Sequence, residues 1–130
     1  MNYVYNSNVP AKQIADLRES VGWNRMEESY NNPLMNSYCH IACYDGGKLV
    51  GYVDSVSNAV TDAYIQDLTV HPDYQNQGIG TELMNRIIAY LKERKIFWIS
   101  VMFEENLAPF YRRFGFHQML CGTMQTYECE

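Results

Sequence analysis

The residues best suited to chemistry form a short glycine-rich segment, Gln75-Asn76-Gln77-Gly78-Ile79-Gly80. Two glycines let the backbone approach a ligand closely. An amphipathic run typical of a helix begins inside the segment, and the first amides of a helix have no partner within it. The helix dipole adds partial positive charge at the same end. The segment therefore predicts a site for an anion such as a phosphate group.

Two known phosphate-binding patterns do not fit this segment. A Walker loop needs a lysine directly after its last glycine, where the chain has Thr81. The dinucleotide-binding pattern needs a third glycine, which is absent. The anion site is therefore of another kind.

The segment resembles motif A of the GCN5-related N-acetyltransferases (GNAT), in which Gln or Arg is followed by Gly-x-Gly/Ala at the spacing of Gln75, Gly78 and Gly80. The preceding residues 67–72 resemble that family's strand and turn, and residues 106–116 are similar to its motif B. Two motifs in the same order and at the same separation make the resemblance specific. It implies the GNAT fold and acetyl transfer from acetyl-coenzyme A (acetyl-CoA).

The resemblance also implies where the cosubstrate binds. The strand before the loop would pair with the pantetheine arm, and the loop amides would hold the pyrophosphate. The residues implied are Leu68, Thr69, Val70, Gln75, Asn76, Gln77, Gly78, Ile79, Gly80, Thr81, Asn106 and Tyr111. Gln75 stands where the family often has arginine, so the loop has no cation. We therefore expect phosphate binding to depend mainly on backbone amides and the helix end.

Tyr111 takes the family's position for a general acid, which returns a proton to the departing thiolate. A phenol with a pKa of about 10 stays protonated at neutral pH and suits this step. The alternative is a tyrosine whose ring fills the edge of the core. Asn106 is expected to cap the following helix or to bond the pantetheine arm.

Asp67 is the candidate base, because an amine that attacks a thioester must lose a proton. Its carboxylate lies in an apolar run, where desolvation would raise its pKa. The alternatives are an acid hydrogen-bonded at a strand distortion, or one that binds the substrate ammonium. Glu104 and Glu105 are further anions for the acceptor side, although an adjacent pair is more typical of a solvated loop.

The acceptor pocket is expected to combine aromatic rings with acids, since such groups hold a cation. Its candidate residues are Trp23, Tyr30, Tyr52, Asp54 and Glu104. For each of them, ordinary core or rim packing is an equally good interpretation. The three histidines do not cluster at ligand spacing, so no metal is expected.

Direct transfer in a ternary complex to a small-molecule amine or a lysine side chain is the favoured reaction, because no cysteine falls at the expected acetyl position. The principal alternative is a non-catalytic acetyl-CoA-binding or sensing module that lacks an acceptor site. Tyr111 discriminates between them, since a binding module has no need of it. A peptide-binding module would leave the glycine-rich loop unexplained.

The chain offers clear signals for the elements that must position these residues. Apolar residues at helical spacing, β-branched runs and glycine or proline punctuation predict them. The expected helices lie within 10–22, 25–31, 79–95 and 107–114. The expected strands are 3–5, 37–44, 49–57, 63–70 and 96–103, with two more short strands in 116–127.

The order strand, glycine-rich turn, long helix, strand predicts a βαβ unit, whose strands are parallel. A hairpin around Asp45-Gly46-Gly47 predicts antiparallel neighbours. The fold class is therefore α/β (α+β), with a mixed, mostly antiparallel sheet of about six to seven strands and helices on both faces. With 130 residues and no linker or repeat, residues 1–130 are expected to form a single N-acetyltransferase domain.

Composition excludes several classes of partner. Fifteen acidic and 10 basic residues give a charge of −5 and no basic stripe, so nucleic acid is not expected. Neither a signal peptide nor an apolar run of membrane-spanning length is evident, so a cytoplasmic protein without membrane contact is expected. The four cysteines are expected to be reduced thiols. A homodimer would be usual for the family.

Overall fold

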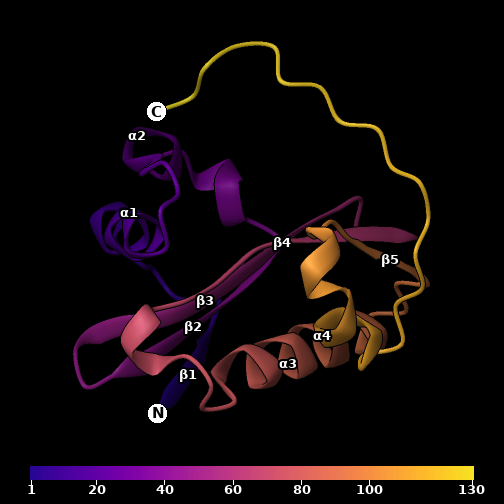
Figure 1. Ribbon diagram of the computed structural model, residues 1–130, viewed down its shortest axis with the longest axis horizontal. Helices are drawn as coiled ribbons and strands as arrows, with labels where there is room; N and C mark the ends of the chain where they lie inside the picture. The colour runs from indigo at the N-terminus through magenta and orange to yellow at the C-terminus, as the bar shows by residue number, and fades with distance from the viewer.

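The computed structural model describes all 130 residues and contains one five-stranded sheet, in the order β1-β2-β3-β4-β5 (Figure 1). The strands are β1 (Asn2–Tyr5), β2 (Cys39–Asp45), β3 (Lys48–Ser57), β4 (Asp62–Val70) and β5 (Trp98–Val101). The α-helices are α1 (Ala11–Ser20), α2 (Glu27–Tyr30), α3 (Ile79–Glu93) and α4 (Ala108–Arg112). Three 3-10 turns complete the set, namely η1 (Pro33–Asn36), η2 (Pro72–Tyr74) and η3 (Glu105–Leu107).

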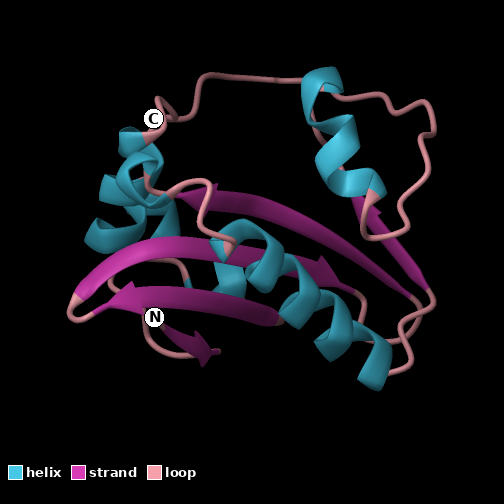
Figure 2. Cartoon of the chain, turned by 60° about the horizontal axis from the view of Figure 1, so that its bottom comes forward, coloured by secondary structure: helices cyan, strands magenta, loops and turns pink.

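Helices cover both faces of the sheet. The α1 and α2 helices lie on one face, while α3 and α4 lie on the other (Figures 1 and 2). Strands β1 to β4 pair antiparallel, and β4 pairs with β5 in parallel through the crossover helix α3. The expected fold class, with its hairpin and βαβ unit, is confirmed.

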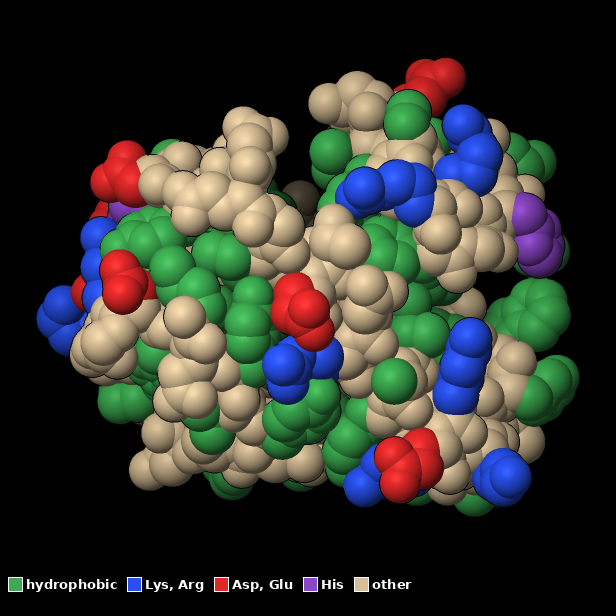
Figure 3. All heavy atoms as spheres, turned by 90° about the horizontal axis from the view of Figure 1, so that it is seen from below, with side chains coloured by type: hydrophobic (Ala, Val, Ile, Leu, Met, Phe, Trp, Pro, Cys, Tyr) green, Lys and Arg blue, Asp and Glu red, His purple; other side chains and the backbone are tan.

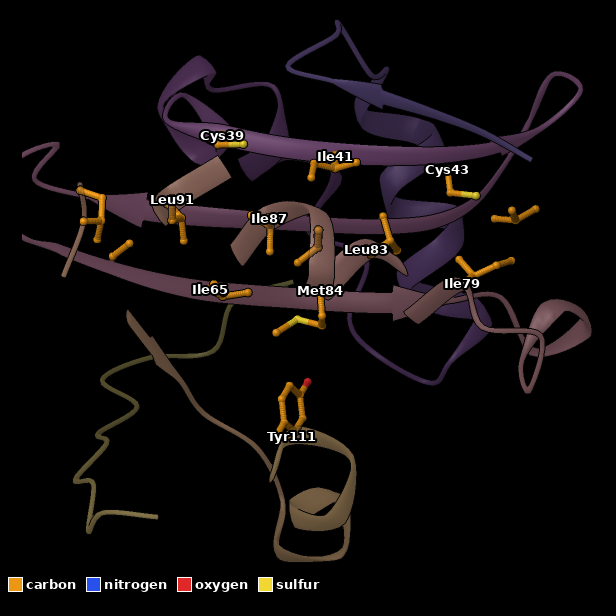
Figure 4. Close-up of a cluster of buried hydrophobic side chains, with 14 residues drawn as sticks. Cys39, Ile41, Cys43, Ile65, Ile79, Leu83, Met84, Ile87, Leu91 and Tyr111 are labelled. Carbon is orange, nitrogen blue, oxygen red and sulfur yellow. The ribbon is translucent and has the colours of Figure 1, made fainter. Parts of the chain in front are cut away.

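The main core lies between α3 and the sheet (Figure 4). The apolar spacing in the sequence produces this packing, because residues three and four apart share one helix face. The buried positions of α3 are Ile79, Leu83, Met84, Ile87 and Leu91. They contact alternate residues of β2 and β4, among them Cys39, Ile41 and Ile65. This core holds the first turn of α3 against the middle of the sheet.

Gly51 on β3 allows α3 to approach the sheet closely. A Cβ atom at this position would lie 2.9 Å from Ile79 Cγ2 and 3.1 Å from Leu83 Cδ1. Contacts that short do not occur without movement of the neighbours. Gly51 therefore determines how closely the N-terminal end of α3, which carries the candidate anion site, approaches the sheet.

The α1 helix begins after Pro10 and ends where the sequence predicted. Gly22 follows it with φ of +86°, a left-handed conformation that glycine adopts without steric cost. The amides of Gly22 and Trp23 bond back to the carbonyls of Glu19 and Arg18, both at 3.0 Å. This turn folds the chain after α1 back over the Arg18 side chain.

The expectation of two further strands in residues 116–127 is wrong, and so is the count of six to seven strands. No strand follows α4, and Leu120 and Met124 are exposed. A run of strand-forming residues needs an adjacent edge to pair with, and composition does not supply one. The tail instead crosses to α2 (Figure 1), where the Met26 amide donates to the Glu130 carbonyl at 2.8 Å. No helix is long and apolar enough to cross a bilayer.

Candidate active site

A bulge in β4 is the central distortion of the site. Tyr52 pairs with Thr69 and Asp54 with Gln66, so β4 carries one more residue than β3 between these pairs. Asp67 takes up the extra length with φ of +60°, an uncommon conformation for a residue other than glycine. The bulge directs the Asp67 side chain to the face that carries α1 and α2, where it contacts Arg18 and Tyr30.

The two parallel strands part at the same place. Pairing between β4 and β5 ends at Ile65 and Val101, while β4 continues to Val70. Residues 66–70 therefore have no strand partner on the β5 side. Their free backbone groups form an edge to which an extended ligand can bond.

The glycine-rich loop lies at the end of this edge. Asn76 and Gly78 have φ of 64° and 86°, and α3 begins at Ile79. Gln75 Nε2 donates to the Val70 carbonyl at 3.0 Å, which closes the loop onto β4. The loop residues before α3 are exposed, and the first amides of the helix lack internal partners. The arrangement is suited to an anion.

Gly80 lies where β4, the loop and α4 meet. A Cβ atom there would contact Val70 Cγ2 and Phe110 Cζ, each at 3.7 Å. The two sequence motifs, 30 positions apart at Gly80 and Phe110, are thus in contact around one helix end.

Arg113, at the end of α4, brings a cation to the loop. Its Nη2 donates to Thr81 Oγ1 at 2.9 Å, and its guanidinium lies 5.0 Å from the centre of the Phe110 ring. It has no carboxylate partner. The loop itself has no cation, as the sequence indicates, but a residue 32 positions after Thr81 supplies one. The surface seen from below shows Lys and Arg side chains beside a hollow (Figure 3).

Tyr111 lies at the edge of the α3 core. Its ring stacks on Phe103 at 4.5 Å and meets Phe110 edge-on at 4.9 Å. The hydroxyl bonds to no protein group and points toward β4 (Figure 4). Burial raises the pKa of Tyr111, so the phenol stays protonated at neutral pH. The side chain thus has both a packing role and a free proton donor.

Asn106 does not cap α4. The residue before the helix is Leu107, and no side chain bonds to the helix start. Asn106 lies exposed within η3, because the 3-10 turn separates it from the helix. The cap interpretation is therefore wrong, and a bond to the pantetheine arm stays a prediction.

On the opposite face, two carboxyl groups share one tyrosine. The Tyr30 hydroxyl lies 2.6 Å from Asp67 Oδ2 and 3.4 Å from Asp54 Oδ2. Asp54 Oδ2 also accepts from the Tyr52 hydroxyl at 2.9 Å, and Asn36 Nδ2 donates to Tyr52 at 3.0 Å. Residues from α2, η1, β3 and β4 thus form one polar network.

The desolvated carboxyl in this network is Asp54. Asp54 is 0% exposed, and burial followed by the charge of Asp67 raises its pKa to about 8. Hydrogen bonds from Tyr52 and Tyr30, with the charge of Arg18, oppose this shift. The Asp67 side chain is 24% exposed and lies 3.4 Å from Arg18 Nη1. The sequence indicated Asp67 as the desolvated acid, but the buried carboxyl is Asp54 on β3, two positions after Tyr52.

Arg18 completes the network and was not among the predicted site residues. Its Nε and Nη2 donate to the backbone and side-chain oxygens of Asn24 at 2.7 and 2.8 Å. Its guanidinium lies 5.3 Å from the centre of the Trp23 ring. The available signal was an arginine on the apolar face of α1, beside Ile14 and Leu17.

The acceptor candidates fall into two groups. Tyr30, Tyr52 and Asp54 lie in the network with Asp67, and Trp23 reaches it through Arg18. Glu104 lies exposed before η3 and makes no contact with the network.

A separate hollow of about 660 Å³ lies between α2 and the chain end, with walls that contain neither Asp67, Tyr111 nor the loop. No group of side chains has the composition of a metal site, and the four cysteines are free.

Comparison with known proteins agrees with this geometry. The model of the acetyltransferase (GNAT) family matches residues 4–116. An uncharacterised N-acetyltransferase, ycf52, from Pyropia yezoensis is 30% identical over 85% of this chain and 67% of its own length. The chain therefore spans about two thirds of that relative.

Two solved structures match nearly the whole chain. A GNAT acetyltransferase from Streptococcus pneumoniae is 30% identical, with a TM-score of 0.79 over 99% of this chain and 98% of its own. A probable acetyltransferase from Staphylococcus aureus has a TM-score of 0.85 over 97% of this chain and 100% of its own, at 22% identity. The latter agrees with the fold alone.

Proposed function

This chain belongs to the acetyltransferase (GNAT) family, and we propose that it moves an acetyl group from acetyl-CoA to a primary amine by direct attack in a ternary complex. The observation that carries the proposal is the coincidence, at one place, of the free β4 edge, the glycine-rich loop and the Tyr111 hydroxyl. We also propose that residues 1–130 form one N-acetyltransferase domain. Homodimer formation and a cytoplasmic location stay predictions.

The donor site runs along β4 and ends at α3. Extended pantetheine carries amide groups, and residues 68–70 have no strand partner on the β5 side, although the Val70 carbonyl already accepts from Gln75. Their remaining free backbone groups can bond these amides. The pyrophosphate would then meet the amides of the loop and of the first turn of α3. The chemistry of these groups fits a long ligand with an anionic end.

Arg113 adds a charge to this donor site. Its guanidinium already bonds Thr81 in the first turn of α3, and it has no competing carboxylate. Guanidinium groups bind phosphate oxygens through charge-assisted hydrogen bonds. We therefore propose Arg113 as a further phosphate-binding group, in addition to the backbone amides and helix end on which binding was expected mainly to depend.

The proposed reaction has balanced proton movements. The neutral amine attacks the acetyl carbon, and its proton passes to Asp67, directly or through water. The carbon–sulfur bond then breaks, and the departing thiolate takes a proton from Tyr111. Before the next turnover Asp67 releases its proton to solvent and Tyr111 regains one from solvent. The products are the acetylated amine and free coenzyme A.

The acceptor is proposed to be a small-molecule amine or a lysine side chain. Aromatic rings and carboxyl groups gather on the α1–α2 face of β3 and β4, which suits a cation. Asp67, at the bulge, is the member of this network nearest the point where β4 and β5 part.

The test is release of free coenzyme A thiol from acetyl-CoA with a panel of polyamines, arylalkylamines, aminoglycosides and lysine peptides. An enzyme releases thiol in stoichiometric amounts with at least one amine class and yields the acetylated product by mass spectrometry. Tight acetyl-CoA binding without thiol release from any amine would instead support a non-catalytic binding module.

A further inference from the structure

Two carboxyl groups lie within hydrogen-bond distance of one hydroxyl in the network. Tyr30 Oη is within 3.4 Å of Asp54 Oδ2 and 2.6 Å of Asp67 Oδ2. A hydroxyl has one proton and two lone pairs, so it can accept from one carboxyl while it donates to the other. Tyr30 therefore has the geometry of a proton relay between the exposed acid and the buried one.

The burial of Asp54, the charge of Asp67 and one unpartnered carboxyl oxygen favour its neutral form, against the hydrogen bonds from Tyr52 and Tyr30. Oδ2 accepts bonds, whereas Oδ1 is buried with no hydrogen-bond partner. An ionised carboxylate needs donors at both oxygens, so an unpartnered oxygen is costly in that form. A protonated Asp54 is thus compatible with this packing at neutral pH.

We propose that Asp54 is a positioning residue that stores the proton removed from the amine, receiving it from Asp67 through the Tyr30 hydroxyl. This inference rests on the proposed acetyl transfer, and it goes further by naming where the proton goes. Asp67 meets the substrate, whereas Asp54 acts only through Tyr30.

The steps conserve every proton. Asp67 takes a proton from the amine as the nitrogen–carbon bond forms. The Tyr30 hydroxyl turns toward Asp54 Oδ2 and gives up its own proton, while its oxygen accepts the proton held by Asp67. Asp67 is then ionised again, and Asp54 is neutral. Asp54 later loses its proton to solvent by the reverse path.

The groups around Asp54 set the pH at which this store is available. They are Arg18 from α1, Tyr30 from α2, His40 and Cys39 from β2, Tyr52 from β3, and Tyr64 and Asp67 from β4. Because the pKa of Asp54 is raised to about 8, the fraction able to accept a proton grows as pH rises toward and above that value. Activity should therefore follow this titration.

The experiment compares wild type, Asp54→Asn and Tyr30→Phe over a range of pH. Wild-type kcat/KM should rise with pH to a midpoint near 8, and Asp54→Asn should lose this limb. Tyr30→Phe retains both carboxyls but should lower kcat/KM above the midpoint by about tenfold or more. The acetyl-CoA affinity should stay within about twofold in both variants.

Matched controls separate the relay from packing. Tyr44→Phe removes a hydroxyl on the same sheet face that bonds only Gln13, and Asp62→Asn removes an exposed carboxyl on β4. Both should retain the wild-type pH profile. A Tyr44→Phe profile altered like that of Tyr30→Phe would attribute the effect to packing and overturn the relay.

Infrared titration tests Asp54 without any need for turnover. Wild type at about pH 6, two units below the pKa of Asp54, should have a band from a neutral carboxylic acid, and Asp54→Asn should lack it. A missing band in folded wild type would overturn the proposal. Thiol release with an unchanged pH limb in Asp54→Asn or Tyr30→Phe would overturn the relay alone. No thiol release with any amine would overturn the proposed function and the relay together.

Discussion

The Tyr52 hydroxyl donates to Asp54 Oδ2 at 2.9 Å, from two positions earlier on the same strand and on the same sheet face. Residues at this spacing lie side by side in a pleated strand. The pair places an acid in the sheet beneath α1 and α2 with a donor at one of its oxygens only. Burial of this acid costs folding free energy when the carboxyl is ionised, so the cost depends on pH.

The stability of the fold should therefore fall as pH rises. Since the pKa of Asp54 is raised from 3.8 to about 8, its favourable contribution is complete below about pH 4 and is lost as pH rises through 8. Asp54→Asn imitates the neutral acid and should lack this dependence. Between pH 4 and 8 the unfolding free energy of wild type should fall relative to that of Asp54→Asn, by up to about 1.4 kcal/mol for each pH unit. Urea denaturation of both proteins at several pH values measures this difference. The same pH dependence in wild type and Asp54→Asn would contradict the prediction.

Gly78→Val should abolish acetyl-CoA binding. Gly78 has φ of +86°, which costs a β-branched residue roughly 1–3 kcal/mol, and relief of that strain displaces the loop amides. Gly46→Val is the control, since Gly46 has φ of +60° in the β2–β3 turn, which contacts Tyr74 through Asp45 but contains no residue of the loop. Both variants should lose stability, but only Gly78→Val should lose affinity. If calorimetry found the same acetyl-CoA affinity in Gly78→Val as in wild type, the assignment of a phosphate-binding loop would be refuted.

Arg113→Gln should weaken acetyl-CoA binding by about tenfold, the effect of one charge-assisted hydrogen bond of roughly 1.4 kcal/mol. The dependence of affinity on salt should also decrease, because one ionic contact is lost. Arg112→Gln is the control, since the adjacent arginine is exposed and makes no contact with Thr81. Equal losses in the two variants would indicate a general effect of charge rather than a contact at the loop.

Tyr111→Phe should lower kcat by about a hundredfold, in the range expected for a general acid. The ring stack on Phe103 remains in the variant, and the hydroxyl has no protein partner to lose. Thermal stability and acetyl-CoA affinity should therefore change little. Wild-type turnover in Tyr111→Phe would eliminate the acid role and leave the tyrosine a packing function.

Local signals were sufficient for much of the fold. Helical spacing from Ile79 to Leu91 predicted α3, and glycine punctuation predicted the end of α1 and the β2–β3 hairpin. These features depend on residues within a few positions of one another. The tail strands failed because Leu120 and Met124 have strand-forming character but no adjacent edge, a property of the tertiary arrangement.

The candidate site was harder to predict from the sequence than the fold, because it depends on contacts between residues far apart in the chain. Asp67 was expected in an apolar setting, but one extra residue in β4 brings it to Arg18 and leaves Asp54 as the buried acid. Such a shift in register cannot be read from alternation alone. The bond from Arg113 to Thr81 likewise joins two helix ends that are distant in sequence.

The parting of β4 from β5 also affects how long a molecule of this protein persists. Residues 66–70 form a free edge in the interior of a sheet, and such edges invite pairing with other chains and local opening. A bound extended cosubstrate would cover the edge and stabilise the native state by mass action. We expect degradation and aggregation in the cell to slow when acetyl-CoA is abundant, so that the abundance of the protein follows the supply of its donor.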